Sequence, residues 1–311
     1  MIDQLIAGIV LGGYYALVAC GLSFMYGVLR VINLAHGSLA VTAAYLVWLL
    51  ADRLTISPFL ALCAIVPVMA GVGYLLQRAI LERSLRTGAL TPLLATFGLS
   101  IVIDNLLFQR FGADTRSLAP ALGDLAYASW TLPGGATVGL LALITLVVAI
   151  ATLGTLHLML RMTPLGRAIR ASAEDPDTAE LVGIDSRNTY AIAAAMAIAT
   201  VGIAGAFLGM RATFAPYAGA TQLIFAFEAV VIGGPGSLWG TLVGAIALGV
   251  AQNLGSQVSP QGFFIGGHAL FFIVLAVRFA LAGRSPLGLA RDLFGRIVRA
   301  YGRTETTEIV G

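Results

Sequence analysis

The stretch from residue 5 to residue 27 reads LIAGIVLGGYYALVACGLSFMYG and carries no charged side chain. Roughly 20 apolar residues in helical form span the hydrocarbon core of a bilayer. Lipid offers no partner to an unpaired backbone amide, so such stretches are expected to be helices. Further apolar segments lie at about 34–51, 58–80, 91–108, 134–160, 189–214, 222–254 and 264–283. The sequence therefore predicts an all-α polytopic membrane protein.

The composition supports this fold class and limits the function. Of 311 residues, 59% are hydrophobic and 11% are charged, whereas roughly a quarter are charged in a soluble domain. This excludes a soluble enzyme, a disordered chain and a nucleic-acid-binding protein. All 18 basic residues are arginine, so a phosphate-binding loop or a lysine Schiff base cannot form. Cys20 and Cys63 lie within apolar segments, so we expect neither a disulfide framework nor a zinc site.

The segment 222–254 is too long for one simple span. It is interrupted by Gly233-Gly234-Pro235-Gly236-Ser237, which predicts two helices or half-helices joined by a break, and about eight or nine membrane helices in all. Arginines gather after the third span, in the loop 161–188 and in the C-terminal tail, and these regions are expected to be cytoplasmic. The N-terminus is then outside. A cytoplasmic C-terminal tail agrees with the number of membrane crossings only if the segment 222–254 crosses twice, or re-enters and returns to the outer face.

Residues 1–283 are expected to form the membrane domain, which includes the loop 161–188. Residues 284–311 form a cytoplasmic tail with an apolar stripe typical of an interfacial amphipathic helix. Leu17-Val18-Ala19-Cys20 resembles a lipoprotein cleavage site. Because no basic residue precedes it, an uncleaved first span is expected.

The cytoplasmic loop carries helix signals. Thr163 and Pro164 suit an N-cap and a first helical position. Asp175-Pro176 can begin a second short helix that ends near Gly183. A helix–turn–helix that lies outside the membrane is expected to bind a soluble partner protein. The alternative is that the segment is an ordinary solvated loop.

Several polar side chains interrupt the apolar segments. Asn33 and His36 would share one face if their stretch is helical, and there they either cap and cross-link helices or face a cavity. Glu228 is an acid within an apolar run, which indicates a functional site, although near the outer end of a span it can serve a structural hydrogen bond. Asp104 and Asn105 suggest the same with weaker support.

Glycines recur at four-residue spacing in three segments: Gly8 and Gly12, Gly205 and Gly209, and Gly236, Gly240 and Gly244. Small residues at this spacing let helix backbones approach closely. The alternative is that these glycines line a path.

Three stretches together resemble the permease subunits of binding-protein-dependent ABC importers, most closely the branched-chain amino acid type. The first runs from Tyr15-Ala16-Leu17 through Ile32-Asn33-Leu34-Ala35-His36-Gly37. The second is the loop from Pro164 to Ile184, and the third runs from Val231 to Gly244.

The resemblance implies a bacterial inner-membrane subunit with a periplasmic N-terminus and a cytoplasmic C-terminus. It implies a second related permease, two cytoplasmic ATPase subunits that hold ATP and magnesium, and a periplasmic solute-binding protein. ATP hydrolysis would drive alternating access for a small polar solute, most closely a branched-chain or other neutral amino acid, with amides or urea as alternatives. The coupling residues would be Gly166, Arg167, Arg170, Glu174, Asp175 and Ala179. The translocation pathway would include Asn33, His36, Glu228, Gly233, Gly234 and Gly236.

Two other classes compete with this interpretation. An intramembrane hydrolase could use Ser237 and His268, but Leu238 stands where the usual serine signature has glycine, and no carboxylate is placed to orient the histidine. A secondary transporter or channel working alone would need paired charges inside its spans for ion coupling.

Overall fold

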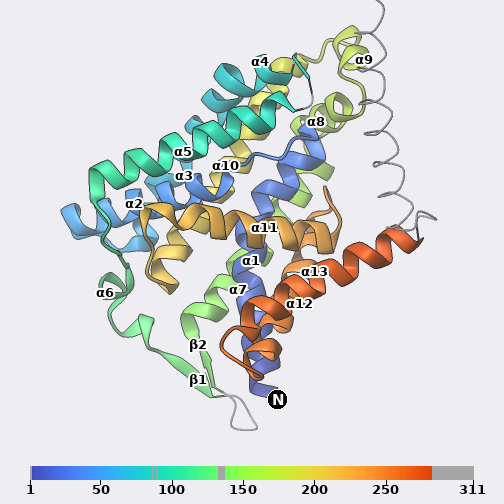
Figure 1. Ribbon diagram of the computed structural model, residues 1–311. Coiled ribbons are helices and arrows are strands. Elements are labelled where there is room, and N and C mark those ends of the chain that lie inside the picture. The colour runs from blue at the N-terminus through green and yellow to red at the C-terminus, as the bar shows by residue number, and fades with distance from the viewer. Residues whose placement is uncertain (1, 86, 89, 132–136, 282–311) are drawn as a thin grey trace, which may run out of the picture. The chain divides into compact units, whose positions relative to one another are not determined.

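The computed structural model describes residues 2–85, 87–88, 90–131 and 137–281. Within this part, nine helices are long and apolar enough to cross a membrane, which confirms the predicted fold class (Figure 1). The membrane helices are α1 (Ile2–Leu29), α2 (His36–Leu54), α3 (Pro58–Leu76), α5 (Thr91–Phe111), α7 (Leu140–Met162), α10 (Ser186–Arg211), α11 (Gly219–Gly233), α12 (Leu238–Ser256) and α13 (Gly262–Leu281).

Shorter elements connect these helices. The π-helix η1 (Gln77–Leu81) and α4 (Glu82–Leu85) extend α3, and α8 (Pro164–Glu174) and α9 (Pro176–Leu181) form the loop after α7. The segment between α5 and α7 contains α6 (Ala119–Leu122), the 3-10 helix η2 (Gly123–Ala126) and an antiparallel pair of short strands, β1 (Ser129–Thr131) and β2 (Thr137–Gly139). A further 3-10 helix, η3 (Pro216–Ala218), precedes α11.

The chain forms two compact units, Met1–Gly267 and His268–Gly311. The described part of the second unit, residues 268–281, belongs to α13. The amphipathic tail predicted at 284–311 lies outside the described residues.

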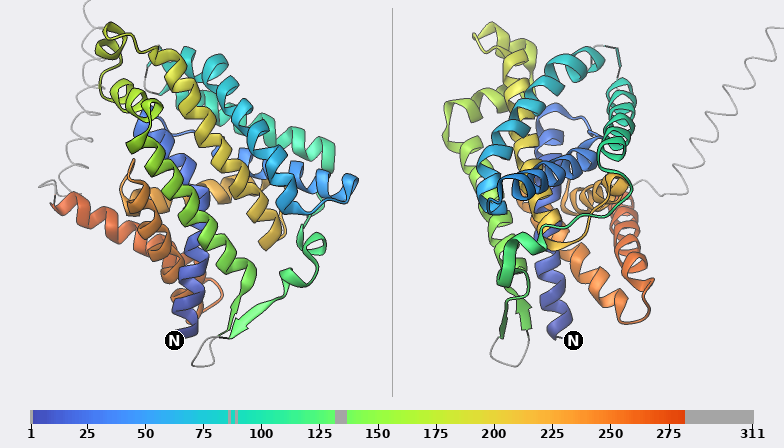
Figure 2. Two further views of the ribbon diagram at one scale, coloured as in Figure 1. Left: turned by 180° about the vertical axis from the view of Figure 1, so that it is seen from behind. Right: turned by 90° about the vertical axis from the view of Figure 1, so that its left-hand side faces the viewer.

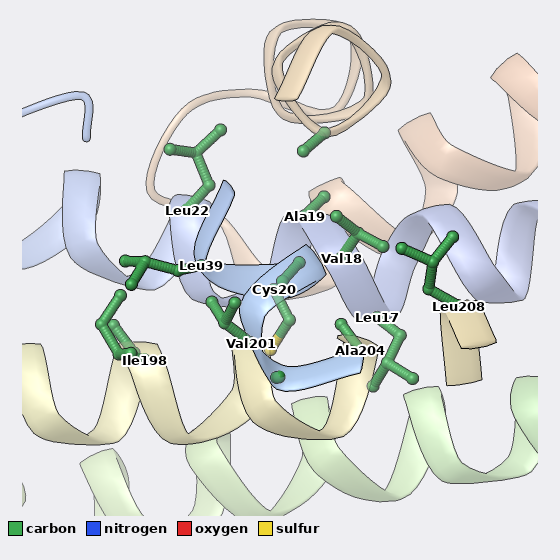
Figure 3. Packing of buried hydrophobic residues seen from close by; sticks show 14 of the residues in the cluster. Leu17, Val18, Ala19, Cys20, Leu22, Leu39, Ile198, Val201, Ala204 and Leu208 are labelled. Atoms are coloured by element: carbon green, nitrogen blue, oxygen red, sulfur yellow. The ribbon is translucent and has the colours of Figure 1, made fainter. Parts of the chain in front are cut away.

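Helices α1 and α10 form the centre of the first unit. Most of their apolar residues are buried, whereas α3 and α5 are buried over a much smaller part of their length. Figure 3 shows Leu17 and Cys20 of α1 pointing toward Val201 and Ala204 of α10, and all four residues are buried. Figure 2 shows α10 lying against α3, and α7 running beside α1. The outer helices expose apolar side chains such as Leu94, as a lipid-facing surface requires.

The predicted glycine spacings mark close helix contacts. A Cβ atom on Gly8 of α1 would come within 2.6 Å of the Val250 Cα in α12. Gly205 of α10 lies against the backbone of α2, and Gly244 of α12 lies against the backbone of α11. The packing interpretation is confirmed where a glycine meets the backbone of a neighbouring helix, as Gly8, Gly205 and Gly244 do. Gly209 meets only the side chains of Leu118 and Phe214, and Gly236 lies in the break between α11 and α12.

The predicted break in 222–254 is confirmed. Helix α11 ends at Gly233 and α12 begins at Leu238. Gly234 and Gly236 have φ angles of 100° and 82°, a conformation that glycine adopts without a steric penalty. The Ser237 hydroxyl accepts a hydrogen bond of 3.1 Å from the Gly240 N–H and so caps α12.

Asn33 and His36 do not lie on one helix, so the condition for a shared helical face is not met. Residues 30–35 are not helical, and α2 begins at His36. The Asn33 Oδ1 instead accepts a hydrogen bond of 3.0 Å from the Ala35 N–H, a local bond that competes with helix formation. The His36 Nε2 lies 2.7 Å from the Val18 carbonyl oxygen, so the chain turns back along α1 before α2 starts.

Candidate functional site

The first candidate surface is the pair of helices α8 and α9, and their termini follow the sequence signals. The Thr163 hydroxyl caps α8 by accepting from the Gly166 N–H at 3.0 Å. The Asp175 carboxylate caps α9 by accepting from the N–H groups of Asp177 and Thr178 at 3.1 and 3.2 Å. Helix α9 ends at Leu181, and Gly183 follows with a φ of 85°.

Hydrogen bonds attach both short helices to the start of α10. The Ser172 hydroxyl of α8 donates to the Ser186 hydroxyl at 3.2 Å, and the Ser186 hydroxyl donates to the Pro176 carbonyl of α9 at 3.1 Å. The Tyr190 hydroxyl donates to the Ser172 carbonyl at 2.5 Å. The helix pair therefore moves with α10 rather than as a free loop.

The outer surface of this pair is charged and grooved. A groove of about 480 Å³ is lined by Arg167, Arg170, Glu174, Asp175, Thr178 and Val182. Val182 in this lining is 73% exposed, and Leu181, which precedes it in the chain, is 87% exposed. Apolar side chains exposed beside charges are typical of a protein–protein contact surface.

The predicted coupling residues fall into two groups. Arg167, Arg170, Glu174 and Asp175 are exposed, whereas Gly166 and Ala179 are buried. A Cβ atom on Gly166 would collide with the last carbonyl groups of α7. Gly166 thus allows α8 to lie against α7, and its place in the structure is a packing position.

The cap of α9 predicts a response to acid. Hydrogen bonds from the Thr178 side chain and backbone hold the pKa of Asp175 below its ordinary value. The stabilisation is therefore fully present above the unfolded pKa of about 4, and it is lost as the pH falls through the lower folded value. We expect the Asp177 and Thr178 amides, in the detergent-solubilised protein, to keep their protection above about pH 4 and to lose it as the pH falls further, measured by hydrogen exchange relative to intrinsic rates. Asp175→Asn keeps an acceptor that does not titrate, so its protection should not change; equal losses in both proteins would contradict the prediction.

The predicted pathway residues lie at different levels of α1. Asn33 and His36 are fully buried, and His36 lies against Val18. The break between α11 and α12 lies closer to the C-terminal end of α1, where Gly236 approaches Gly27. Val18 and Gly27 are nine positions apart in α1, which is about 13 Å of helix rise.

Glu228 and the polar pair of α5 have separate surroundings. Glu228 is 4% exposed and lies nearer to the end of α11 at Gly233 than to its start. Asn105 donates to the Ile101 carbonyl of its own helix at 2.8 Å and accepts from the Tyr217 hydroxyl at 3.3 Å. The structure does not gather the pathway candidates into one site, and their role stays a prediction.

A cleft that the sequence analysis did not foresee lies between α1, the end of α10 and the start of α11. It has a volume of about 220 Å³, and Tyr14, Arg211 and Gln222 line it. The available signal was Arg211, a charged residue inside the apolar segment 189–214. Its neighbours are distant in sequence, so the cluster could not be assembled from the chain alone.

Comparison with known proteins assigns the family. Residues 4–282 match the family model described as branched-chain amino acid transport system / permease component. The chain belongs to this family. The resemblance seen in the sequence is confirmed, and the permease is not itself a catalytic enzyme. Ser237, the nucleophile of the hydrolase alternative, is accounted for as a helix cap.

Individual relatives of the permease cover nearly its whole length. The high-affinity branched-chain amino acid transport system permease protein BraD of Pseudomonas aeruginosa is 31% identical over 289 residues, which is 89% of this chain and 94% of that protein. The corresponding LivH protein of Escherichia coli is 28% identical over 290 residues, covering 89% and 93%. A probable LivH of Methanocaldococcus jannaschii is 28% identical over 292 residues, covering 90% of each. No solved structure matches the permease significantly.

Proposed function

We propose that this permease carries branched-chain aliphatic amino acids across the inner membrane of a bacterium as one subunit of an ATP-driven importer. The observation that carries the proposal is the family match over residues 4–282, which includes the exposed helix pair α8–α9. The substrate named for the BraD and LivH relatives supports amino acids over amides and urea.

The complex would contain a second related permease, two ATPase subunits and a solute-binding protein. The chain has no lysine, so ATP and magnesium would be bound by the ATPase subunits. The distribution of arginines supports a periplasmic N-terminus and a cytoplasmic C-terminus, which places α8 and α9 on the ATPase side.

Coupling would run through the groove residues Arg167, Arg170, Glu174 and Asp175. ATP binding can bias the permease between two conformations only through contacts that differ between them. Closure of the ATPase dimer would displace α8 and α9, and α10 with them because of its hydrogen bonds to both. The buried residues Asn33, His36 and Glu228 and the break at Gly233, Gly234 and Gly236 would then rearrange along the path.

Reconstitution tests this function. The complete complex in vesicles, supplied with ATP and the solute-binding protein, should accumulate radiolabelled leucine and not urea. The permease alone should neither accumulate leucine against a gradient nor hydrolyse ATP. Accumulation by the permease alone would contradict the proposal, as would a complete complex that transports urea and ignores leucine.

A further inference from the structure

The cleft beside Arg211 has the size of a site for a small solute. Its volume is about 220 Å³, below the roughly 300–1,000 Å³ of cavities that hold drug-sized ligands. It is formed by α1, α10, α11 and the first turn of α13, with Thr221 and Ala212 exposed at its edge. A ligand could therefore enter from outside the helix bundle.

Arg211 brings an unbalanced positive charge to this cleft. Its side chain is partly buried, and the guanidinium carbon lies 4.8 Å from the centre of the Tyr14 ring. In the described part of the chain, no carboxylate forms an ion pair with Arg211. A charge withdrawn from water is favourable only when it is paired, and a guanidinium pairs best with a planar carboxylate through two parallel hydrogen bonds.

A polar contact orients the other side of the cleft. The Tyr14 hydroxyl donates to the Gln222 Oε1 at 2.6 Å, which links α1 to the start of α11. The neighbouring Tyr15 hydroxyl donates to the Gln252 Oε1 at 2.6 Å. Both phenol groups are held by side-chain amides, so the rings beside Arg211 are fixed before any ligand arrives.

The remaining wall is aromatic. The Phe225 ring lies 5.0 Å from the Tyr15 ring and stacks on Phe264 at 6.4 Å, both measured between ring centres. Such a wall suits an aliphatic side chain, because burial of apolar surface stabilises the bound state. One end of the cleft therefore fits a carboxylate and the other fits a hydrocarbon group.

We propose that this cleft is a substrate-binding station for small aliphatic amino acids. Arg211 binds the carboxylate, and Phe225 and Phe264 contact the side chain. The inference rests on the proposed transport function and adds a site to it. The cleft lies at the end of α10 opposite to Ser186, where the coupling helices are attached, so it lies on the side from which an importer receives its solute.

The test compares Arg211→Gln with Arg211→Lys in the complete reconstituted complex. The measured quantity is the number of leucine molecules transported for each ATP hydrolysed. A charge-assisted hydrogen bond contributes about 1.5–3 kcal/mol, so Arg211→Gln is expected to lower this ratio at least tenfold, with ATP hydrolysis retained. Arg211→Lys keeps the charge but not the two parallel hydrogen bonds, so it should recover part of the ratio and lie between wild type and Arg211→Gln. Arg110→Gln, at the exposed end of α5, is the matched control and should behave as wild type.

The outcomes separate the two proposals. Failure of the wild-type complex to transport leucine would overturn the transport function itself. An unchanged ratio in Arg211→Gln, in a complex that does transport leucine, would overturn the binding station alone. A parallel fall of transport and ATP hydrolysis, with a lowered melting temperature in both Arg211 variants, would assign Arg211 a structural role and also overturn the station.

Discussion

The double variant Arg167→Glu/Arg170→Glu is expected to reduce ATP-driven leucine uptake to background while the subunit still inserts into the membrane. Both arginines are exposed and line the groove beside Glu174 and Asp175. Their reversal turns a balanced groove into one with acidic groups only. Like charges across a contact cost several kcal/mol, and each 1.4 kcal/mol is about tenfold in affinity. The ATPase subunits should therefore bind the variant at least about a hundredfold more weakly.

The measurements are uptake in cells and co-purification of the ATPase subunits. Arg83→Glu is the control, because Arg83 is also exposed and belongs to α4, away from the groove. Retained uptake and co-purification in the control, with loss of both in the double variant, would support the coupling role. Wild-type uptake by the double variant would rule out that role for the groove.

The substitution Gly244→Val is expected to separate α11 from α12 and to lower the free energy of unfolding of the subunit. A Cβ atom at this position would come within 2.9 Å of the Gly233 Cα and still closer to the Ala229 carbonyl oxygen. Backbone atoms cannot rotate away, so the overpacking penalty should reach about 3 kcal/mol, the upper end of its usual range. The melting temperature of the purified subunit in detergent should fall, and less folded protein should be recovered.

Gly154→Val in α7 provides the matched control for this change. It introduces the same side chain into a helix, but no atom lies within 4 Å of the new Cβ position. Its stability should change only by the difference in helix propensity, about 0.5 kcal/mol or less. Equal melting temperatures for the two variants would contradict the prediction, because they would show that the close contact between α11 and α12 contributes little to the free energy of unfolding.

The spans and helix caps could be predicted because they depend on local sequence. Apolar length decides whether a segment can cross a bilayer, and a cap such as Thr163 acts on a neighbouring N–H. The break at Gly234 could also be predicted from the local sequence, because glycine next to proline marks a turn.

Residues 30–35 could not be predicted because their conformation depends on distant partners. Arg30 has a φ of 54° without being glycine. The Leu34 N–H is satisfied by the Thr96 hydroxyl of α5 at 3.1 Å. Asn33 and Ala35 are fully buried. Non-helical backbone is tolerated within a membrane protein where other parts of the protein surround it, and the sequence of the segment does not reveal that surrounding.

For the candidate sites, too, the residues could be predicted from the sequence but their burial and their neighbours could not. Gly166 and Arg167 are adjacent in the loop, yet one is buried and the other exposed, and this difference arises from the packing of α8 on α7. The cleft joins Tyr14 of α1 to Arg211 and Gln222, which come together only in the folded bundle.

Helix α10 connects the two ends of the molecule's first unit in a single piece. It contains 26 residues without proline, which corresponds to about 39 Å of continuous rise. Its first turn is hydrogen-bonded to α9, which belongs to the surface proposed to bind the ATPase subunits, and its last residue is Arg211 of the cleft. A displacement of α8 and α9 can thus be transmitted to the cleft through a single unbroken helix.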